Sequence, residues 1–198
     1  MALTDVDRRL ARLSVAICLG DWELVRSLRG ECGPGEPDRA WREAVLQVHL
    51  FAGFPRVVRA LDVLAEAGGL GALEDGEADW EPDDFERGRA LFERIYADGA
   101  ERVRAGIDAQ HPVFGRWIEG HAYGRVLSRP GLAADRRELL AVACLAALGQ
   151  ERQLASHVRG AVRCGAAADE PGGVLDAIAD LLGDEALERS RRVVERFR

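Results

Sequence analysis

The sequence predicts an all-α protein, a helical bundle that contains an internal helical-hairpin repeat. Apolar residues recur at spacings of three and four, helix start and stop residues flank these segments, and strand signals are nearly absent. The spacing is clearest in three sets of residues: Leu10, Leu13 and Ile17; Trp41, Val45 and Val48; Leu139, Val142 and Leu145. The 198 residues suffice to bury a substantial core without disulfides or metal ions.

Residues 1–66 are predicted to form an N-terminal helical repeat with recognisable helix boundaries. Thr4 and Asp7 have the spacing of a capping box for the first helix. The later boundaries are, in chain order, Gly20 as C-cap, Asp21 as N-cap, Pro37-Asp38 at the start of a third helix, and Gly53-Phe54-Pro55 between the third and fourth.

Residues 67–83, rich in glycine and acidic residues and without periodicity, are predicted to be a linker or long loop. The region 84–198 is then a second helical unit. Its predicted helices cover 84–97, 100–109 and about 112–127, then a hairpin after a break at Pro130-Gly131, and a final pair over roughly 170–196.

The two ends of the chain resemble each other. "DRRLARLSVAICLGDWELVRSLRGECG", from Asp7, parallels "DRRELLAVACLAALGQERQLASHVRGAVRCG", from Asp135. With a short gap, Leu10 aligns with Glu138, and Ser27 aligns with His157. We therefore expect one copy to carry a polar pair and the other to serve as scaffold.

Charge and composition exclude several classes of function. The net charge is −7 and the isoelectric point is about 5.2, which argues against a nucleic-acid partner because such binding needs a concentrated basic face. With neither a long apolar run nor a signal peptide, we expect no membrane partner and a cytoplasmic location. The four cysteines lack metal-ligand spacing and are predicted to be buried thiols, and we propose no metal site: Cys18, Cys32, Cys144 and Cys164.

Glu138 and His157 are the candidate catalytic pair. If their segment is an antiparallel hairpin turning at Gly149, Glu138 lies eleven residues before the turn and His157 eight after it. At 1.5 Å per residue their axial levels then differ by only about 4 to 5 Å. Gln150 and Gln153 share the helix stripe of His157 and are candidate substrate-binding residues.

A carboxylate beside an imidazole is the minimum equipment for moving a proton, because the carboxylate fixes the tautomer of the ring. The alternative from spacing alone is a solvated acid in the first helical turn and a hydrogen-bonded core or interface histidine. His121 and Tyr123 are further candidates, although two residues apart they do not share a helix face. The other interpretation is that Tyr123 packs in the core and His121 is an exposed or interface histidine. His49 is expected to be a hydrogen-bonded core histidine.

The stretch "HAYGRVLSRPGLAADRRELLAVACLAALGQERQLASHVRGAVRCGAAADE" resembles the carboxymuconolactone decarboxylase family, which is related to alkyl hydroperoxidase D (AhpD). The Tyr-Gly, Arg-Pro-Gly-Leu, Arg-Glu-Leu and Leu-x-x-His-x-x-Gly-Ala motifs follow the family's order. "REAVLQVHLFAGFPRVVRAL" in the first half looks like the family's glutamate-led helix. The resemblance implies an AhpD-like helical bundle and a homo-oligomer, as dimer, trimer or hexamer.

The resemblance also implies a reaction class. In the peroxidase branch of the family a glutamate and a histidine accompany a Cys-x-x-Cys, and here Gln150 and Gln153 occupy the cysteine positions. Glutamine cannot supply a thiolate, which makes thiol peroxidase activity the least favoured reading. The decarboxylase branch implies cofactor-free chemistry on a small anionic lactone or carbonyl compound. Arg129 or Arg137 would then hold substrate carboxylates.

Two functions from different classes remain open at this point. The first is a cofactor-independent lyase or isomerase that uses Glu138 and His157 for acid-base chemistry. The second is a non-catalytic oligomer that binds a small molecule or serves as a scaffold. A buried charge-assisted hydrogen bond suits either function, so retention of the pair does not decide between them.

Overall fold

The computed structural model describes residues 3–33, 35–79 and 84–197, and in these ranges it contains helices and loops without a β-strand. The all-α prediction is therefore confirmed. The elements are α1 (Asp5–Leu19), α2 (Trp22–Gly30), α3 (Asp38–Glu66), α4 (Asp84–Tyr96), η1 (Ala97–Gly99), α5 (Ala100–Gln110), α6 (Pro112–Trp117), η2 (Ile118–Leu127), α7 (Ala134–Ala147), α8 (Glu151–Cys164), α9 (Glu170–Ala177), η3 (Ala179–Leu181), α10 (Asp184–Val194) and η4 (Glu195–Phe197).

Local capping chemistry sets the ends of the first helix. The Thr4 hydroxyl accepts a hydrogen bond from the Asp7 backbone N–H at 3.1 Å, and the Asp7 carboxylate accepts one from the Thr4 backbone N–H at 3.1 Å. These two bonds form the predicted capping box. Gly20 ends α1 in the left-handed conformation, with φ of 77°, which a residue with a side chain rarely adopts.

The third helix bends where the sequence predicts a boundary. Gly53 has non-helical dihedral angles, φ 76° and ψ 165°, so α3 consists of two helical segments that meet at this residue. Pro55 follows, and its ring and missing N–H prevent the upstream helix from continuing through it. After the bend, the Phe54 ring stacks on His49, with ring centroids 4.9 Å apart.

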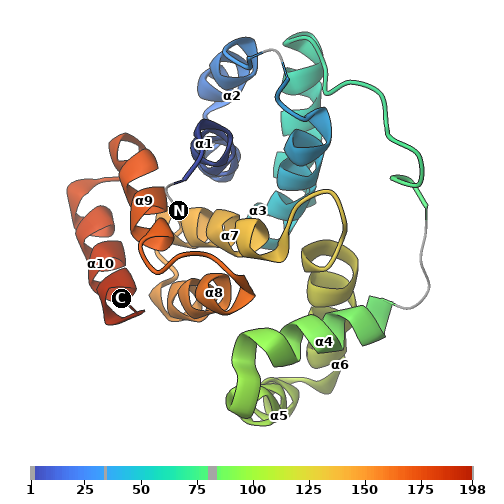
Figure 1. The fold of residues 1–198 in the computed structure, drawn as a ribbon, viewed down its shortest axis with the longest axis vertical. Coiled ribbons are helices and arrows are strands. Elements are labelled where there is room, and N and C mark those ends of the chain that lie inside the picture. The colour runs from blue at the N-terminus through green and yellow to red at the C-terminus, as the bar shows by residue number, and fades with distance from the viewer. Residues whose placement is uncertain (1–2, 34, 80–83, 198) are drawn as a thin grey trace.

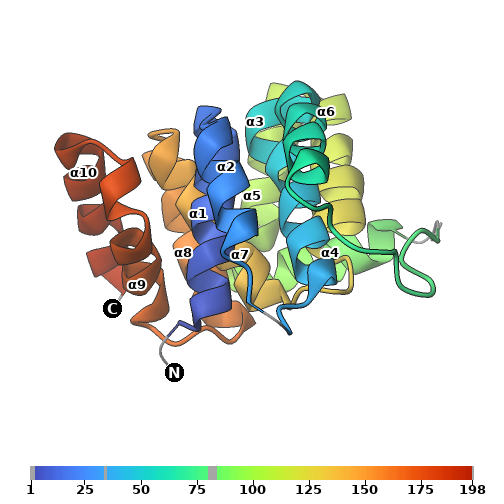
Figure 2. The same ribbon diagram turned by 90° about the horizontal axis from the view of Figure 1, so that it is seen from above.

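Helix α7 lies in the middle of the molecule (Figure 1). It contacts α1, α3, α8 and α9, and the view from above shows α9 and α10 on one side and α3 and α6 on the other (Figure 2). The main core is built from the apolar faces of these helices, and its largest fully buried side chains include Trp41, Leu13, Leu154 and Ile178. Because α7 is covered on several sides, two of its charged side chains, Arg137 and Glu138, are buried in protein as well.

The π-helix η2 replaces the second part of a helix predicted over 112–127. Helix α4 crosses η2 closely, because a Cβ added at Gly88 would lie 2.3 Å from the Glu119 carbonyl oxygen and 2.6 Å from the Gly124 nitrogen. This approach packs Phe92 and Ile95 of α4 against Tyr123 of η2 in a second, smaller apolar cluster.

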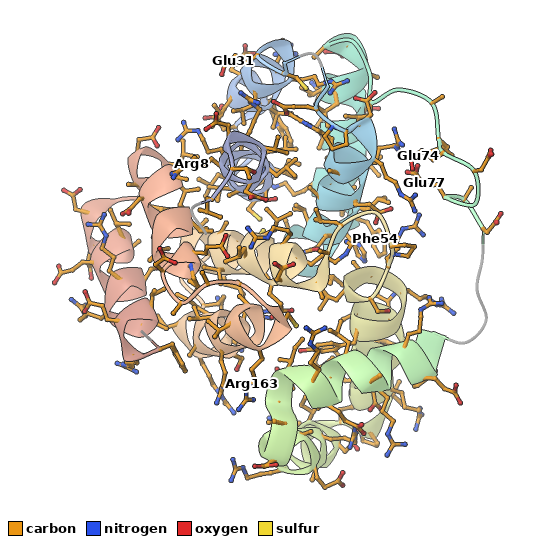
Figure 3. All side chains as sticks on the ribbon, in the orientation of Figure 1. Arg8, Glu31, Phe54, Glu74, Glu77 and Arg163 are labelled. Atoms are coloured by element: carbon orange, nitrogen blue, oxygen red, sulfur yellow. The ribbon has the colours of Figure 1, made fainter. Side chains whose placement is uncertain are left out.

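Residues 67–79 run along the outside of α3 as a loop (Figure 1). Glu77 in this loop is only 3% exposed, and its two carboxylate oxygens accept hydrogen bonds from Arg42 of α3 at 2.6 and 2.7 Å. Figure 3 shows Glu74 and Glu77 on the same loop. Residues 80–83 of the predicted linker lie outside the described residues.

Candidate functional site

The structure brings Glu138 and His157 together. Helices α7 and α8 form an antiparallel hairpin that turns at Gly149, which has φ of 66°. His157 Nδ1 lies 2.9 Å from Glu138 Oε2, close enough for a hydrogen bond between ring and carboxylate. The Glu138 side chain is 1% exposed and that of His157 14%, so the carboxylate is buried and only the ring reaches toward solvent.

The Glu138 carboxylate occupies a space that only a glycine leaves open. A Cβ added at Gly160 on α8 would lie 2.2 Å from Glu138 Oε2 and 3.0 Å from its carboxyl carbon. The second carboxylate oxygen, Oε1, is buried without a hydrogen-bond partner in the protein. An unpaired buried carboxylate oxygen is costly, and native structures keep few such groups unless a water, ion or ligand meets them.

Two tyrosines border this carboxylate. The hydroxyl groups of Tyr96, at the end of α4, and Tyr123, in η2, are 3.2 Å apart. Burial raises the pKa of Tyr123 well above its ordinary value, and the neighbouring Tyr96 and Glu138 add to this effect. Burial also raises the pKa of Tyr96, against an opposing hydrogen bond with Tyr123. Both phenols are therefore neutral at physiological pH and can donate hydrogen bonds.

Bonds to the backbone fix α4 next to α8. The guanidinium of Arg163, labelled in Figure 3, donates to the Ile95 carbonyl at 2.6 Å, and that of Arg94 donates to the Cys164 carbonyl at 2.9 Å. Cys164 itself is buried, and burial together with the nearby Glu138 raises the pKa of its thiol to about 11. It is thus a neutral thiol near pH 7 rather than a thiolate nucleophile.

The two glutamines lie on the same helix as His157 but nearer its solvent-exposed start. Gln150 and Gln153 are both exposed, and the Gln150 amide donates to the Leu148 carbonyl at 3.3 Å. Both glutamines therefore lie at the solvent-exposed turn of the hairpin and do not enclose Glu138 and His157.

The two arginines expected to hold substrate carboxylates have Glu43 as their carboxylate partner. Arg129 Nε lies 2.8 Å from Glu43 Oε1, and the guanidinium of Arg137 lies 2.7 Å from Glu43 Oε2. Arg137 is 1% exposed and also donates to the carbonyl oxygens of Arg129 and Leu132. These bonds hold the turn at Pro130 against α3, so both guanidinium groups are directed to Glu43 and not to Glu138.

His121 and Tyr123 face different surroundings, in agreement with their two-residue separation. Tyr123 joins the cluster around Glu138, whereas His121 Nε2 lies 2.7 Å from His49 Nε2 of α3. His121 and Arg129 line a cavity of about 230 Å³ that neither Glu138 nor His157 lines. Of the predicted site residues, Tyr123 thus lies with Glu138 and His157, whereas His121 and Arg129 lie at a separate cavity.

Sequence reasoning missed several neighbours of the pair. Phe51 of α3 meets the His157 ring edge-on, with centroids 6.2 Å apart, and Tyr96 enters from α4. Arg159 has a buried Nε without a hydrogen-bond partner and is close enough to influence the pKa of Tyr96. Only Gly160 had a signal in the sequence, as the glycine of the His-x-x-Gly motif.

Within residues 3–33, 35–79 and 84–197, no group of three or more histidine, cysteine, aspartate or glutamate side chains is arranged to hold a metal ion. No helix within the same residues has the length and apolar character needed to cross a membrane.

The fold and the site define an all-helical protein with a carboxylate–imidazole pair buried in an antiparallel hairpin. Residues 112–196 match the model of the carboxymuconolactone decarboxylase family. The resemblance seen in the sequence is confirmed there. The region includes η2, the Pro130 turn, α7 and α8, and hence every predicted site residue.

A curated relative agrees with this assignment. The 4-carboxymuconolactone decarboxylase of Acinetobacter baylyi (strain ATCC 33305 / BD413 / ADP1) is 42% identical over 57 residues. The match covers 29% of this chain and 42% of the relative, so less than half of the relative's length is spanned.

Proposed function

We propose that this protein is a cofactor-independent lyase or isomerase of the carboxymuconolactone decarboxylase type that acts on a small anionic lactone or carbonyl compound. The observation that carries the proposal is the state of Glu138: one oxygen bonds His157, and the other is buried without a partner in the protein. A hydrogen-bond donor from a substrate or a water would satisfy that second oxygen. The match of residues 112–196 to the family model supports the same reaction class.

The proposed chemistry needs one proton and one stabilised anion. Loss of CO2 from a conjugated lactone carboxylate breaks a carbon–carbon bond and leaves its electron pair in the ring system as a dienolate. Because the Glu138 carboxylate accepts the hydrogen bond of His157 Nδ1–H, the proton donor in this scheme is the imidazolium, which gives its Nε2 proton to the dienolate carbon and becomes the neutral ring. The ring then regains a proton from water.

The phenols would stabilise the charge that develops on oxygen. A neutral Tyr123 hydroxyl, next to Tyr96 and Glu138, is a fixed hydrogen-bond donor in a buried environment, where such bonds are stronger than in water. Arg159 is our candidate for holding a substrate carboxylate, since its Nε is buried and lacks a partner in the protein. Arg129 and Arg137 are less suited to this role because both bond Glu43 and Arg129 lines a cavity that neither Glu138 nor His157 lines.

The test is turnover of 4-carboxymuconolactone, followed as CO2 release, by the wild type, His157→Ala and Glu138→Gln. We expect the wild type to be active and each variant to lose at least about 100-fold in kcat, the usual scale of a general acid-base contribution. His111→Ala is the matched control, because His111 is exposed in the turn between α5 and α6. Full activity in a folded His157→Ala protein would refute the assigned roles.

The second candidate is a non-catalytic oligomer that binds a small molecule or serves as a scaffold. The observation that favours it is the burial of the pair together with the engagement of Arg129 and Arg137 by Glu43, since a buried ion pair can also be purely structural. This function predicts that the wild type leaves the lactone unchanged, whereas His157→Ala lowers the unfolding midpoint. Thiol peroxidase activity remains the least favoured, with Gln150 and Gln153 at the cysteine positions.

A further inference from the structure

A second polar cluster surrounds the cavity between α3, η2 and the loop before residue 80. The cavity measures about 230 Å³, somewhat below the roughly 300 Å³ at which pockets for drug-sized ligands begin. Its basic side chains include Arg39 and His49 from α3 and His121 and Arg129 from η2 and the turn that follows it. The cavity therefore has the size for a small metabolite, and its lining carries four arginines and two histidines against three acidic residues.

Two of the acidic side chains that line the cavity, Glu43 and Glu77, are paired with arginines, whereas Asp79 is exposed. Glu43 bonds both Arg129 and Arg137, so a single carboxylate faces two guanidinium groups. Glu77 accepts both of its side-chain bonds from Arg42. Arg137 and Arg42 are not among the residues that line the cavity. They neutralise the charges of Glu43 and Glu77 from outside it, so the positive charge of Arg129 is left at the cavity.

Arg39 provides the observation that points to a ligand. Its terminal nitrogen pairs with Glu74 at 2.8 Å, and the Glu74 side chain is 54% exposed at the rim. The Nε atom of Arg39, by contrast, is buried and has no hydrogen-bond partner. A buried donor without an acceptor is rare in folded proteins, and an oxyanion is the acceptor that a guanidinium binds best.

The histidine pair adds a defined donor pattern. His49 Nδ1 lies against the Leu46 carbonyl oxygen, which only accepts, so this nitrogen carries a proton. In neutral His49 the Nε2 atom is then the acceptor, and His121 Nε2 donates to it across 2.7 Å. Stacking of Phe54 on the His49 ring fixes its orientation at the cavity.

We propose that this cavity is a binding site for a small oxyanion, a carboxylate or phosphate group, held by Arg39 and Arg129 with the His49–His121 pair beside it. The site is separate from Glu138 and His157, which do not line the cavity. Its occupancy does not depend on the reaction proposed above, and binding can be measured without turnover.

Isothermal titration of the full chain with succinate and, separately, with inorganic phosphate tests the proposal. Binding of either anion is the expected result, and the arm that gives heat identifies the group. Arg39→Gln should weaken binding about tenfold, the effect of losing one charge-assisted hydrogen bond. Arg26→Gln is the matched control, because Arg26 makes comparable exposed ion pairs with Glu23 and Glu66 away from the cavity.

A second variant guards against a folding defect at Arg39. His121→Gln keeps a polar side chain at the cavity and should also weaken binding, while the unfolding midpoint of each variant shows that the fold is intact. Absence of binding to both anions by the wild type would overturn the proposal. So would equal affinities for the wild type, Arg39→Gln and His121→Gln, because the anion would then bind elsewhere on the protein.

Discussion

Replacement of Gly160 by alanine tests the packing that seats the Glu138 carboxylate. An added Cβ would lie 2.2 Å from Glu138 Oε2, so the carboxylate must move, and we expect this movement to cost its bond to His157. Alanine in a helix is favoured over glycine by about 1 kcal/mol, whereas loss of a charge-assisted hydrogen bond costs about 1.5–3 kcal/mol. We therefore expect a net destabilisation of roughly 0.5–2 kcal/mol.

Gly106→Ala in α5 is the matched control. Gly106 is exposed within a helix, and nothing lies within 4 Å of an added Cβ, so this variant should gain up to about 1 kcal/mol. Urea unfolding followed by circular dichroism gives both free energies, and the signs should be opposite. If Gly160→Ala is stabilised as much as Gly106→Ala, the carboxylate does not occupy the position described, and its bond to His157 is not the source of its orientation.

Three further predictions concern stability and thiol chemistry. The Arg42 guanidinium lowers the pKa of Glu77 from 4.5 to about 2. The stability that this ion pair adds is therefore present above pH 4.5 and lost as the pH falls toward 2. The unfolding midpoint of Glu77→Gln, measured as a function of pH, should lack this acid dependence. Thr4→Ala should lower the unfolding free energy by about 1 kcal/mol through loss of the cap, whereas Thr4→Ser should retain most of it. Because burial raises the pKa of Cys164 to about 11, a thiol reagent at pH 8 should modify the partly exposed Cys32 first, and rapid reaction of Cys164 in the native protein would contradict its burial.

The helical framework could be predicted because local chemistry sets it. The capping box at Thr4, the left-handed glycine at Gly20 and the bend at Gly53 all depend on residues within a few positions of each other. The approach of Glu138 to His157 followed from helix rise alone, since both residues belong to one hairpin. Short sequence separation is what these successes share.

The parts that could not be predicted depend on contacts between distant segments. Arg137 bonds Glu43 of α3, 94 residues away, and no local pattern identifies that partner. The π-helical winding of η2 follows from its close crossing with α4 at Gly88, again a tertiary contact. The second group of polar residues, with His49 as a member, forms only because α3 and η2 lie side by side in the fold.

The predicted repeat of two helical hairpins has a consequence for the substitutions that each hairpin can accept. Leu10 of α1, aligned with Glu138, is 2% exposed within the core, and Ser27 of α2, aligned with His157, is exposed and bonds Glu31. Under the proposed function, the amino-terminal hairpin contributes packing alone, whereas the carboxy-terminal hairpin must also keep its polar pair. We therefore expect the amino-terminal hairpin to accept substitutions that the carboxy-terminal hairpin cannot tolerate.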